Sequence, residues 1–494
     1  MPPCQNPPTC RAGGGTAHGH PIPERHGARE WLLGAALLIL AWLPTAVACA
    51  ACLGVTLFWH PDGSVLAPLL LFWFGVFGAV ARKRGPLPGR VVRPDDEPEL
   101  AALVRDVAAR LGFRAPLLVR IVPEVQASVG RVRVAGVRSH VLLLGLPLLR
   151  NLTERELASV VAHELAHERR ERGHCAALLS YAHARLADRL DRRFRPLAPP
   201  AAPLLRASQR YLWRTETAAD AGAAEVAGTE ATASALERTV TLHSVFECLA
   251  EPWLSELAER DAWPKDFYDA LDTAFADPHM AARAARTAAE DDAVDPYATA
   301  DHPPLAIRLA ALPTRAGTGT YGAAPVALRT GPEIARWCTR RLALQNGEEE
   351  NDVQPVRLLA LPPEELRELN DAPGTAPLFR ATGTDTPAAA VATALDTLAD
   401  GSWQRLARRL EPRLRRAPAA VRGQLARRVF TAAVAEALAE TLETSRWTPA
   451  TRWTTTVLTS PDGRRTVDLR ALVADAVTAA DPAVPRALLK ETPA

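Results

Sequence analysis

Residues 31–81 constrain the fold of this chain most, because they contain a single charged side chain, Asp62. An uncharged run extends from Trp31 to Trp59, which is longer than the roughly 20 residues that a membrane-spanning helix needs. A second uncharged run covers residues 65–81. A soluble protein would need a very large core to bury both runs. The sequence therefore predicts a transmembrane helical hairpin over residues 31–81.

Basic residues flank this hairpin, with Arg25 and Arg29 before it and several more within residues 82–90, whereas the turn contains no Lys or Arg. The positive-inside rule then places both flanks in the cytoplasm. This predicts a multi-pass protein of the cell membrane, with the lipid bilayer as a partner and the remaining domains cytoplasmic. An alternative is that residues 25–48 form a cleaved signal peptide, and even then the second run keeps the rest of the chain in the cytoplasm.

Composition narrows the class of protein further. The net charge of +2 gives no global field that favours nucleic acid, so no nucleic-acid partner is expected. Seven cysteines at irregular spacing argue against a disulfide framework and suit a reducing compartment. Residues 1–30 are rich in Pro and Gly and indicate a disordered tail. Its Cys4, Cys10, His18 and His20 could bind a metal, but the tail has no helix or strand pattern.

An H-E-x-x-H motif, from His163 to His167, lies within an amphipathic helix pattern. Two histidines four residues apart share one helical face and can bind one metal ion, with Glu164 between them at the open side of the metal. Thr153 and Glu156 predict a capping box at the start of this helix. The charged residues that follow His167, beginning with Glu168, are typical of a solvated face. A third ligand is needed to complete a site.

Glu216 is the candidate for that ligand, on a separate helix of small residues that extends from residue 204 to about 226. Asp220 lies one turn further on and shares its face, where it could accept the spare ring N–H of a ligating histidine. The alternative is that both carboxylates lie on an exposed helix face. From the residues alone, His302 reads as a neighbour of a helix start.

Other elements follow from periodicity and breakers. Strands are predicted at 117–122, 126–134 and 140–144, and the alternating Val and Arg of the second strand suit the edge of a sheet. Further helices are predicted at 99–111, 175–194, 230–260 and 264–290, with a proline-rich break at 196–203. In the C-terminal third we expect helices at 356–369, 388–398, 405–416 and 421–442, followed by a hairpin of strands 453–459 and 464–469.

Three segments, by their order and spacing along the chain, resemble those of one family. Residues 98–312 are similar to the HtpX-like and CAAX-prenyl-protease-like family of membrane-associated gluzincin zinc metallopeptidases. The segments that carry the resemblance are residues 157–167, residues 216–223 (ETAADAGA) and residues 301–309 (DHPPLAIRL). The resemblance implies a mainly α fold with a small antiparallel sheet, an α+β zincin-type peptidase domain. It divides the chain into a tail (1–30), the hairpin (31–81), a metallopeptidase domain (90–315) and a C-terminal domain without a motif (325–494).

The same resemblance implies one Zn²⁺ per chain, bound by His163, His167 and Glu216, with Glu164 as the catalytic base. It also implies a substrate-side or oxyanion role for His302 and a structural role for Arg308. A protein or peptide substrate would lie along the strand that begins at Gln126, Ala127 and Ser128, where family members often have Asn-Ala-Phe instead. Family members also carry further apolar runs after the zinc motif, and this chain has none between residues 175 and 211.

Three functions fit these expectations. The first is a membrane-anchored zinc endopeptidase in which Glu164 takes a proton from water and passes it to the leaving amine. The second is a catalytically silent membrane scaffold or chaperone-like binding protein with a peptidase fold. The third is a sensor-transducer protease, which the short external turn disfavours because it offers little surface for a signal.

Overall fold

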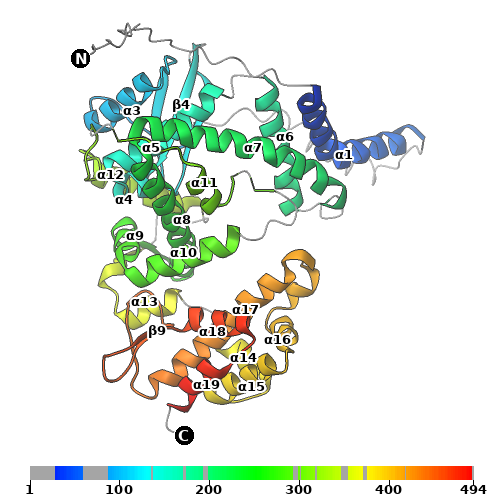
Figure 1. Cartoon of the computed structure of the whole chain (residues 1–494), viewed down its shortest axis with the longest axis vertical. Coiled ribbons are helices and arrows are strands. Elements are labelled where there is room, and N and C mark those ends of the chain that lie inside the picture. The colour runs from blue at the N-terminus through cyan, green and yellow to red at the C-terminus, as the bar shows by residue number, and fades with distance from the viewer. Residues whose placement is uncertain are drawn as a thin grey trace, which may run out of the picture.

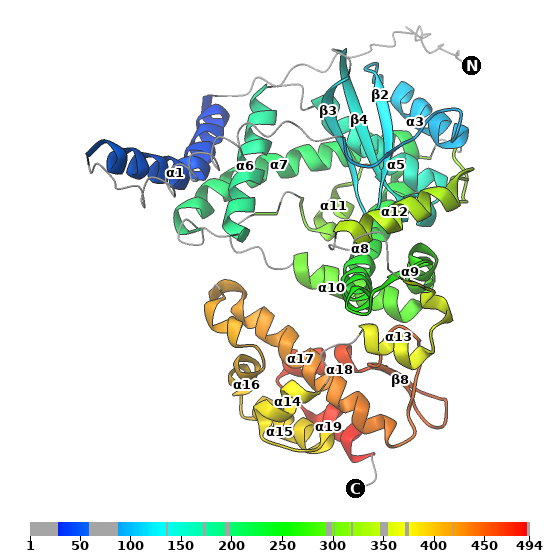
Figure 2. The same cartoon turned by 180° about the vertical axis from the view of Figure 1, so that it is seen from behind.

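The computed structural model is mainly helical with three small sheets, which confirms the predicted fold class in outline. It describes residues 28–58, 87–134, 137–170, 174–192, 198–292, 299–300, 302–317, 320–345, 354–370, 375–417 and 419–491. The second predicted membrane run, residues 65–81, lies outside the described residues, as does the predicted tail up to residue 27. Figures 1 and 2 show a larger upper part, a helical lower part that ends at the C-terminus, and α1 at one side.

The upper part contains most of the strands and the longest helices. Its helices are α1 (Ala28–Phe58), α3 (Pro98–Arg110), α4 (Leu146–Asn151), α5 (Glu154–Arg170), α6 (His174–Arg192), α7 (Ala198–Ala227), α8 (Thr229–Ala258), α9 (Phe267–Ala276), α10 (Pro278–Asp292), α11 (Leu305–Ala311) and α12 (Gly331–Gln345). Its strands are β1 (Arg90–Val91), β2 (Leu117–Val122), β3 (Ala127–Val134), β4 (Val137–Gly145), β5 (Ala262–Pro264) and β6 (Gln354–Val356).

The lower part is built from shorter helices and one small sheet. Its helices are α13 (Pro363–Asn370), α14 (Ala376–Thr382), α15 (Pro387–Ala399), α16 (Trp403–Leu410), α17 (Ala419–Glu443), α18 (Leu469–Ala479) and α19 (Ala483–Lys490), with 3₁₀ turns η2 (Leu358–Ala360) and η3 (Pro412–Arg416). Strands β7 (Thr448–Pro449), β8 (Val457–Thr459) and β9 (Thr466–Asp468) form an antiparallel sheet, so the predicted C-terminal hairpin is confirmed with shorter strands.

Two helix predictions were wrong at prolines. Helix α7 begins at Ala198, within the predicted proline-rich break, because prolines in a first turn lose no hydrogen bond. The predicted single helix 264–290 instead divides into α9 and α10 at Asp277. Pro278 cannot continue a helix, and Asp277 Oδ1 accepts from the N–H of His279 at 2.9 Å and thus caps α10.

The main sheet has the strand order β1-β2-β4-β3 and is mixed, which corrects the predicted antiparallel sheet. Strand β2 pairs with β4 in parallel, whereas β3 pairs with β4 and β1 pairs with β2 antiparallel. The parallel pair arises because β4 inserts between β2 and β3 and runs opposite to β3. Its apolar residues 141–144 favour this central position, and β3 lies at the edge, as its alternation predicted.

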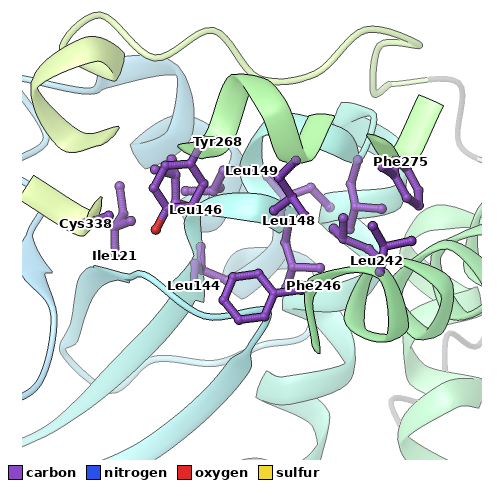
Figure 3. Close-up of a cluster of buried hydrophobic side chains, with 14 of the residues drawn as sticks. Ile121, Leu144, Leu146, Leu148, Leu149, Leu242, Phe246, Tyr268, Phe275 and Cys338 are labelled. Atoms are coloured by element: carbon purple, nitrogen blue, oxygen red, sulfur yellow. The ribbon is translucent and has the colours of Figure 1, made fainter. Parts of the chain in front are cut away.

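The main hydrophobic core lies where the end of β4, α4 and α8 meet. In Figure 3, Leu144, Leu146, Leu148 and Phe246 point toward one another. The three leucines are at most 1% exposed, and burial of each leucine contributes about 1.5–3 kcal/mol. This packing fixes the chain directly before α5 and so sets the position of that helix.

Helix α1 packs on the upper part with its first half only. Leu37 and Ala41 are buried against a small cluster from α6 and α7 that includes Leu179 and Leu205. After Pro44, no described residue of α1 is buried. Figures 1 and 2 show that α1 bends sharply in its middle, which a proline in a helix interior explains.

A second hydrophobic core fills the lower part, with Phe430, Val434 and Leu438 of α17 fully buried at its centre. The first core also includes Leu369 of α13 and Trp453, which precedes β8, whereas the second core begins at Leu378. The two parts meet around α10, α13 and the small sheet of β7–β9. Residues of the lower part thus pack in the first core, and contacts such as that between Trp453 and Trp253 of α8 hold the two parts together.

Candidate metal centre

Helix α5 begins with the capping box that its sequence predicted. The N–H of Thr153 donates to Glu156 Oε2 at 2.8 Å, and the N–H of Glu156 donates to Thr153 Oγ1 at 3.4 Å. The same buried carboxylate accepts from Ser234 Oγ of α8 at 2.5 Å and lies 3.5 Å from Arg238 Nε. The start of α5 is thus fixed both by its own cap and by α8.

The apolar face of α5 fixes the direction of its histidines. Leu157, Val161 and Leu165 are fully buried in the main core. His163 and His167, four residues apart, share a different face of the helix and are only partly buried. The core therefore holds the two imidazoles one above the other.

Helix α7 packs closely on α5 because small residues line the contact. A Cβ added at Gly222 would lie 3.1 Å from Ala166 Cβ, and Ala223 is fully buried. This close approach brings Glu216 and Asp220 to the histidine face, where they are 5% and 1% exposed. The alternative interpretation, an exposed carboxylate face, was wrong.

The side chains of His163, His167 and Glu216 converge, and one ligand atom from each lies within 4.8 Å of the others. The two Nε2 atoms are 3.1 Å apart, and Glu216 lies 2.9 Å from His167 Nε2 and 3.6 Å from His163 Nε2. Donors held at about 2.0–2.1 Å by one tetrahedral zinc ion are about 3.3 Å apart, so these separations fit such an ion. The cluster has the donor set of a His₂Glu zinc site.

Asp220 and Arg308 contact the cluster through His163 and hold that histidine in place. Asp220 Oδ1 lies 2.8 Å from His163 Nδ1, which directs the other ring nitrogen of His163 toward Glu216. The Arg308 guanidinium of α11 donates two hydrogen bonds to the Asp220 carboxylate, at 2.9 and 2.7 Å. The sequence predicted the contact of Asp220 with a histidine but gave no partner for Arg308, which lies 88 residues away from Asp220 along the chain.

Hydrogen bonds within the cluster keep the carboxylates of Glu216 and Asp220 ionised. Burial alone would raise the pKa of Glu216, but hydrogen bonds from His167 and His302 outweigh it and lower the pKa well below its ordinary value. Burial would also raise the pKa of Asp220, and the hydrogen bonds from Arg308 and His163 lower it instead. Both groups can therefore act as acceptors or ligands at neutral pH.

Glu164 is in a different electrostatic setting. Burial raises the pKa of Glu164 above its ordinary value. The positive charge of the His163 and His167 imidazoles lowers this pKa, but by less than burial raises it. A carboxyl with a raised pKa accepts a proton more readily, which is the property of a general base.

His302 lies on the open side of the cluster. Its Nδ1 is 2.7 Å from Glu216 Oε2, and its side chain is 63% exposed. The structure thus brings the residue that precedes α11 into contact with the third predicted ligand. An oxyanion role for His302 stays a prediction.

Glu168 corrects the prediction of a solvated face after His167. It is buried, and its Oε1 accepts from Arg131 Nε of β3 at 2.5 Å and lies 3.1 Å from His140 Nε2 of β4. A single carboxylate therefore ties the C-terminal half of α5 to two strands. The alternation of charge along the sequence hid this role, because the partners lie 28 and 37 residues earlier.

The predicted substrate strand is the edge strand β3. Ala127 and Ser128 pair with Leu144 and Leu143 of β4, and Gln126 Nε2 donates to Ser128 Oγ at 3.1 Å. Gln126 is exposed at the start of this strand. In the main sheet of the described residues, β3 is the last strand, and its outer edge faces no further strand. Binding of a substrate along β3 stays a prediction.

Comparison with known proteins gives one match. Residues 94–316 match peptidase family M48, and this range contains the three convergent residues of the cluster. No curated protein matches the chain, and neither does any solved structure.

Proposed function

We propose that this chain, whose residues 94–316 form a metallopeptidase domain of family M48, is a membrane-anchored endopeptidase that depends on one zinc ion. Peptidases of this family bind zinc and act on proteins. The single observation that carries the proposal is the convergence of His163, His167 and Glu216 at the separations of a tetrahedral site.

The assigned ligands are the Nε2 atoms of both histidines and the carboxylate of Glu216. Three protein donors leave a fourth position open for water, as in catalytic rather than structural zinc sites. Asp220 orients His163, and Arg308 in turn orients Asp220. A zinc ion bound there would polarise the scissile carbonyl and lower the pKa of its bound water to about 7.

Glu164 is the general base in this proposal. Its carboxylate takes one proton from the attacking water and then delivers that proton to the leaving amine nitrogen as the C–N bond breaks. His302, exposed beside Glu216, is positioned to donate to the oxygen that becomes negative in the tetrahedral intermediate.

The edge strand β3 offers the binding mode for the substrate. An extended peptide would add to its free edge through backbone hydrogen bonds, with Gln126, Ala127 and Ser128 at the end where the strand begins. Such binding selects extended segments, so unfolded proteins and loops are the expected substrates.

Helix α1 is the proposed membrane anchor. It is the one described helix that is long and apolar enough to cross a membrane, over residues 28–54. Its exposed apolar side chains include Leu32, Ile39 and Val47, which water would solvate poorly. The basic flanks favour a cytoplasmic catalytic domain only together with a second span at residues 65–81, and that span stays a prediction.

The substitution Glu164→Gln tests the proposal. We expect full-length protein with this change to retain one zinc ion per chain and to lose cleavage of casein or an unstructured peptide, because Gln cannot take the proton. Glu237→Gln, on the exposed side of α8, is the matched control and should cleave like the wild type. Undiminished cleavage by Glu164→Gln would refute the assigned role, and a wild-type protein that holds zinc without cleaving any peptide would favour the scaffold function.

A further inference from the structure

A cavity of about 340 Å³ lies between the two parts of the molecule, and none of its lining residues belongs to the metal centre. Helices α8 and α10 of the upper part and α17 and α18 of the lower part form its walls. Figure 1 shows α10 directly above α17 and α18. The volume is at the lower end of the range of small-ligand sites, so a compact molecule would fill it.

The lining of this cavity is strongly basic. It contains five arginines, Arg283, Arg286, Arg427, Arg428 and Arg470, against three carboxylates. The carboxylates are already engaged in part, since Arg286 pairs with Asp468 and Arg428 Nε lies 3.8 Å from Glu290 Oε2. Arg470 pairs with Glu436, which is not a lining residue, at 3.1 Å. With Glu436 counted, the five arginines face four carboxylates, and the one positive charge in excess favours an anion.

Two lining residues of α17 present polar atoms that no described residue satisfies. Thr431 is 8% exposed, and its Oγ1 has no hydrogen-bond partner. Arg427, one turn earlier on the same face, donates from Nη2 to the carbonyl of Ala474 at 3.0 Å, and its buried Nε has no partner. A buried polar group without a partner destabilises the folded state, so these two atoms leave hydrogen-bonding capacity for a ligand in the cavity.

The remaining lining restricts the class of ligand. No aromatic side chain lines the cavity, so no surface for stacking a nucleobase is present among the described residues. Val245, Met280 and Ala284 supply a small apolar part of the lining. We infer that the cavity binds a compact metabolite with a phosphate group, whose oxygens accept from Arg427 and Thr431, and that the bound anion links α10 to α17.

Because the cavity lies between the two parts of the molecule, a bound anion would affect how firmly they are held together. Polar contacts already cross between the two parts near it, where Gln424 Nε2 donates to the carbonyl of Glu290 at 2.5 Å and Arg283 Nη1 donates to Thr454 Oγ1 at 2.9 Å. An anion among these groups would neutralise the arginines that both parts contribute. It would therefore stabilise the folded arrangement of the two parts by mass action.

The test is the melting temperature of the full-length protein in mild detergent, titrated with inorganic phosphate and with pyrophosphate. We expect a saturable increase that sodium chloride at matched ionic strength does not give. Arg427→Gln should weaken the binding constant about tenfold or more, because it removes charge-assisted hydrogen bonds. Arg405→Gln, on an exposed site of α16 outside the lining, is the matched control and should bind like the wild type.

Thr431→Val gives a second, independent arm. Removal of a buried hydroxyl without a partner should leave the unliganded protein as stable as before or more stable, while it weakens phosphate binding several-fold. A hydroxyl with no ligand would give the first effect without the second. The inference is overturned if neither anion gives a saturable shift, or if Arg427→Gln and Thr431→Val both bind with the wild-type constant.

Discussion

The metal centre and the arginine cavity both lie where helices from distant parts of the chain meet, but they balance charge in opposite ways. At the metal centre the buried carboxylates of Glu216 and Asp220 have imidazole or guanidinium partners, as with Asp220 and Arg308 at 2.7 Å. In the cavity, arginines outnumber carboxylates and Thr431 has no partner among the described residues. The metal centre is thus a rigid, nearly complete donor set, whereas the cavity has volume and charge left for a ligand.

The two sites also differ in how many of their residues can be recognised from the sequence alone. Two proposed ligands and the proposed base of the metal centre lie within five consecutive residues of α5. The cavity draws its lining from four helices between residues 244 and 475. Site residues that lie close together on one helix leave a motif, whereas site residues brought together only by tertiary contacts leave none.

Glu216→Gln should have the largest effect on zinc binding and peptide cleavage. It removes one of three proposed donors, so we expect zinc content near zero after dialysis and peptide cleavage at background. The fold should persist, because Arg308 keeps its pair with Asp220. Metal analysis and a cleavage assay check this.

The Glu216→Gln variant, compared with Arg427→Gln, also tests whether the metal centre and the cavity act independently. Glu216→Gln should keep the phosphate-dependent increase in melting temperature, and Arg427→Gln should keep zinc and cleavage while its increase requires about tenfold more phosphate or greater. If either substitution abolished both properties, the two sites would not be independent and the contrast drawn between them would be wrong.

The difference between local and tertiary information explains what the sequence predicted. The capping box of Thr153 and Glu156 and the edge position of β3 depend on nearby residues, and both are confirmed. The parallel pairing of β2 with β4 was missed because it depends on which strand inserts between the others. The buried role of Glu168 was missed because its partners lie on the sheet.

Asp220→Asn should reduce zinc affinity by an intermediate amount. Asp220 positions His163 without belonging to the three-residue cluster, and loss of such a supporting carboxylate costs about 10–100-fold in metal affinity. We expect this loss in a competition titration with a zinc chelator, together with normal activity at saturating zinc. Arg308→Met should weaken zinc less, because it acts one contact further away. An equal or larger loss for Arg308→Met would assign the orienting role to the arginine itself.

Gly222→Ala should have the smallest effect, and it tests the close packing of α5 on α7. The new Cβ would lie 3.1 Å from Ala166 Cβ, so the helices must separate by a few tenths of an ångström. That strain costs about 1 kcal/mol and offsets the gain of about 1 kcal/mol that alanine gives over glycine in a helix. We expect little change in the free energy of unfolding and a several-fold loss of zinc affinity.

Gly423→Ala on α17 is the control for this substitution, since nothing lies within 4 Å of its added Cβ. It should stabilise the protein by about 0.5–1 kcal/mol and leave zinc affinity unchanged. Denaturant unfolding and the chelator titration give both quantities for each variant. If Gly222→Ala stabilised the protein as much as Gly423→Ala and bound zinc normally, the spacing of α5 and α7 would not set the donor separations, and the metal centre would be less rigid than the comparison with the cavity requires.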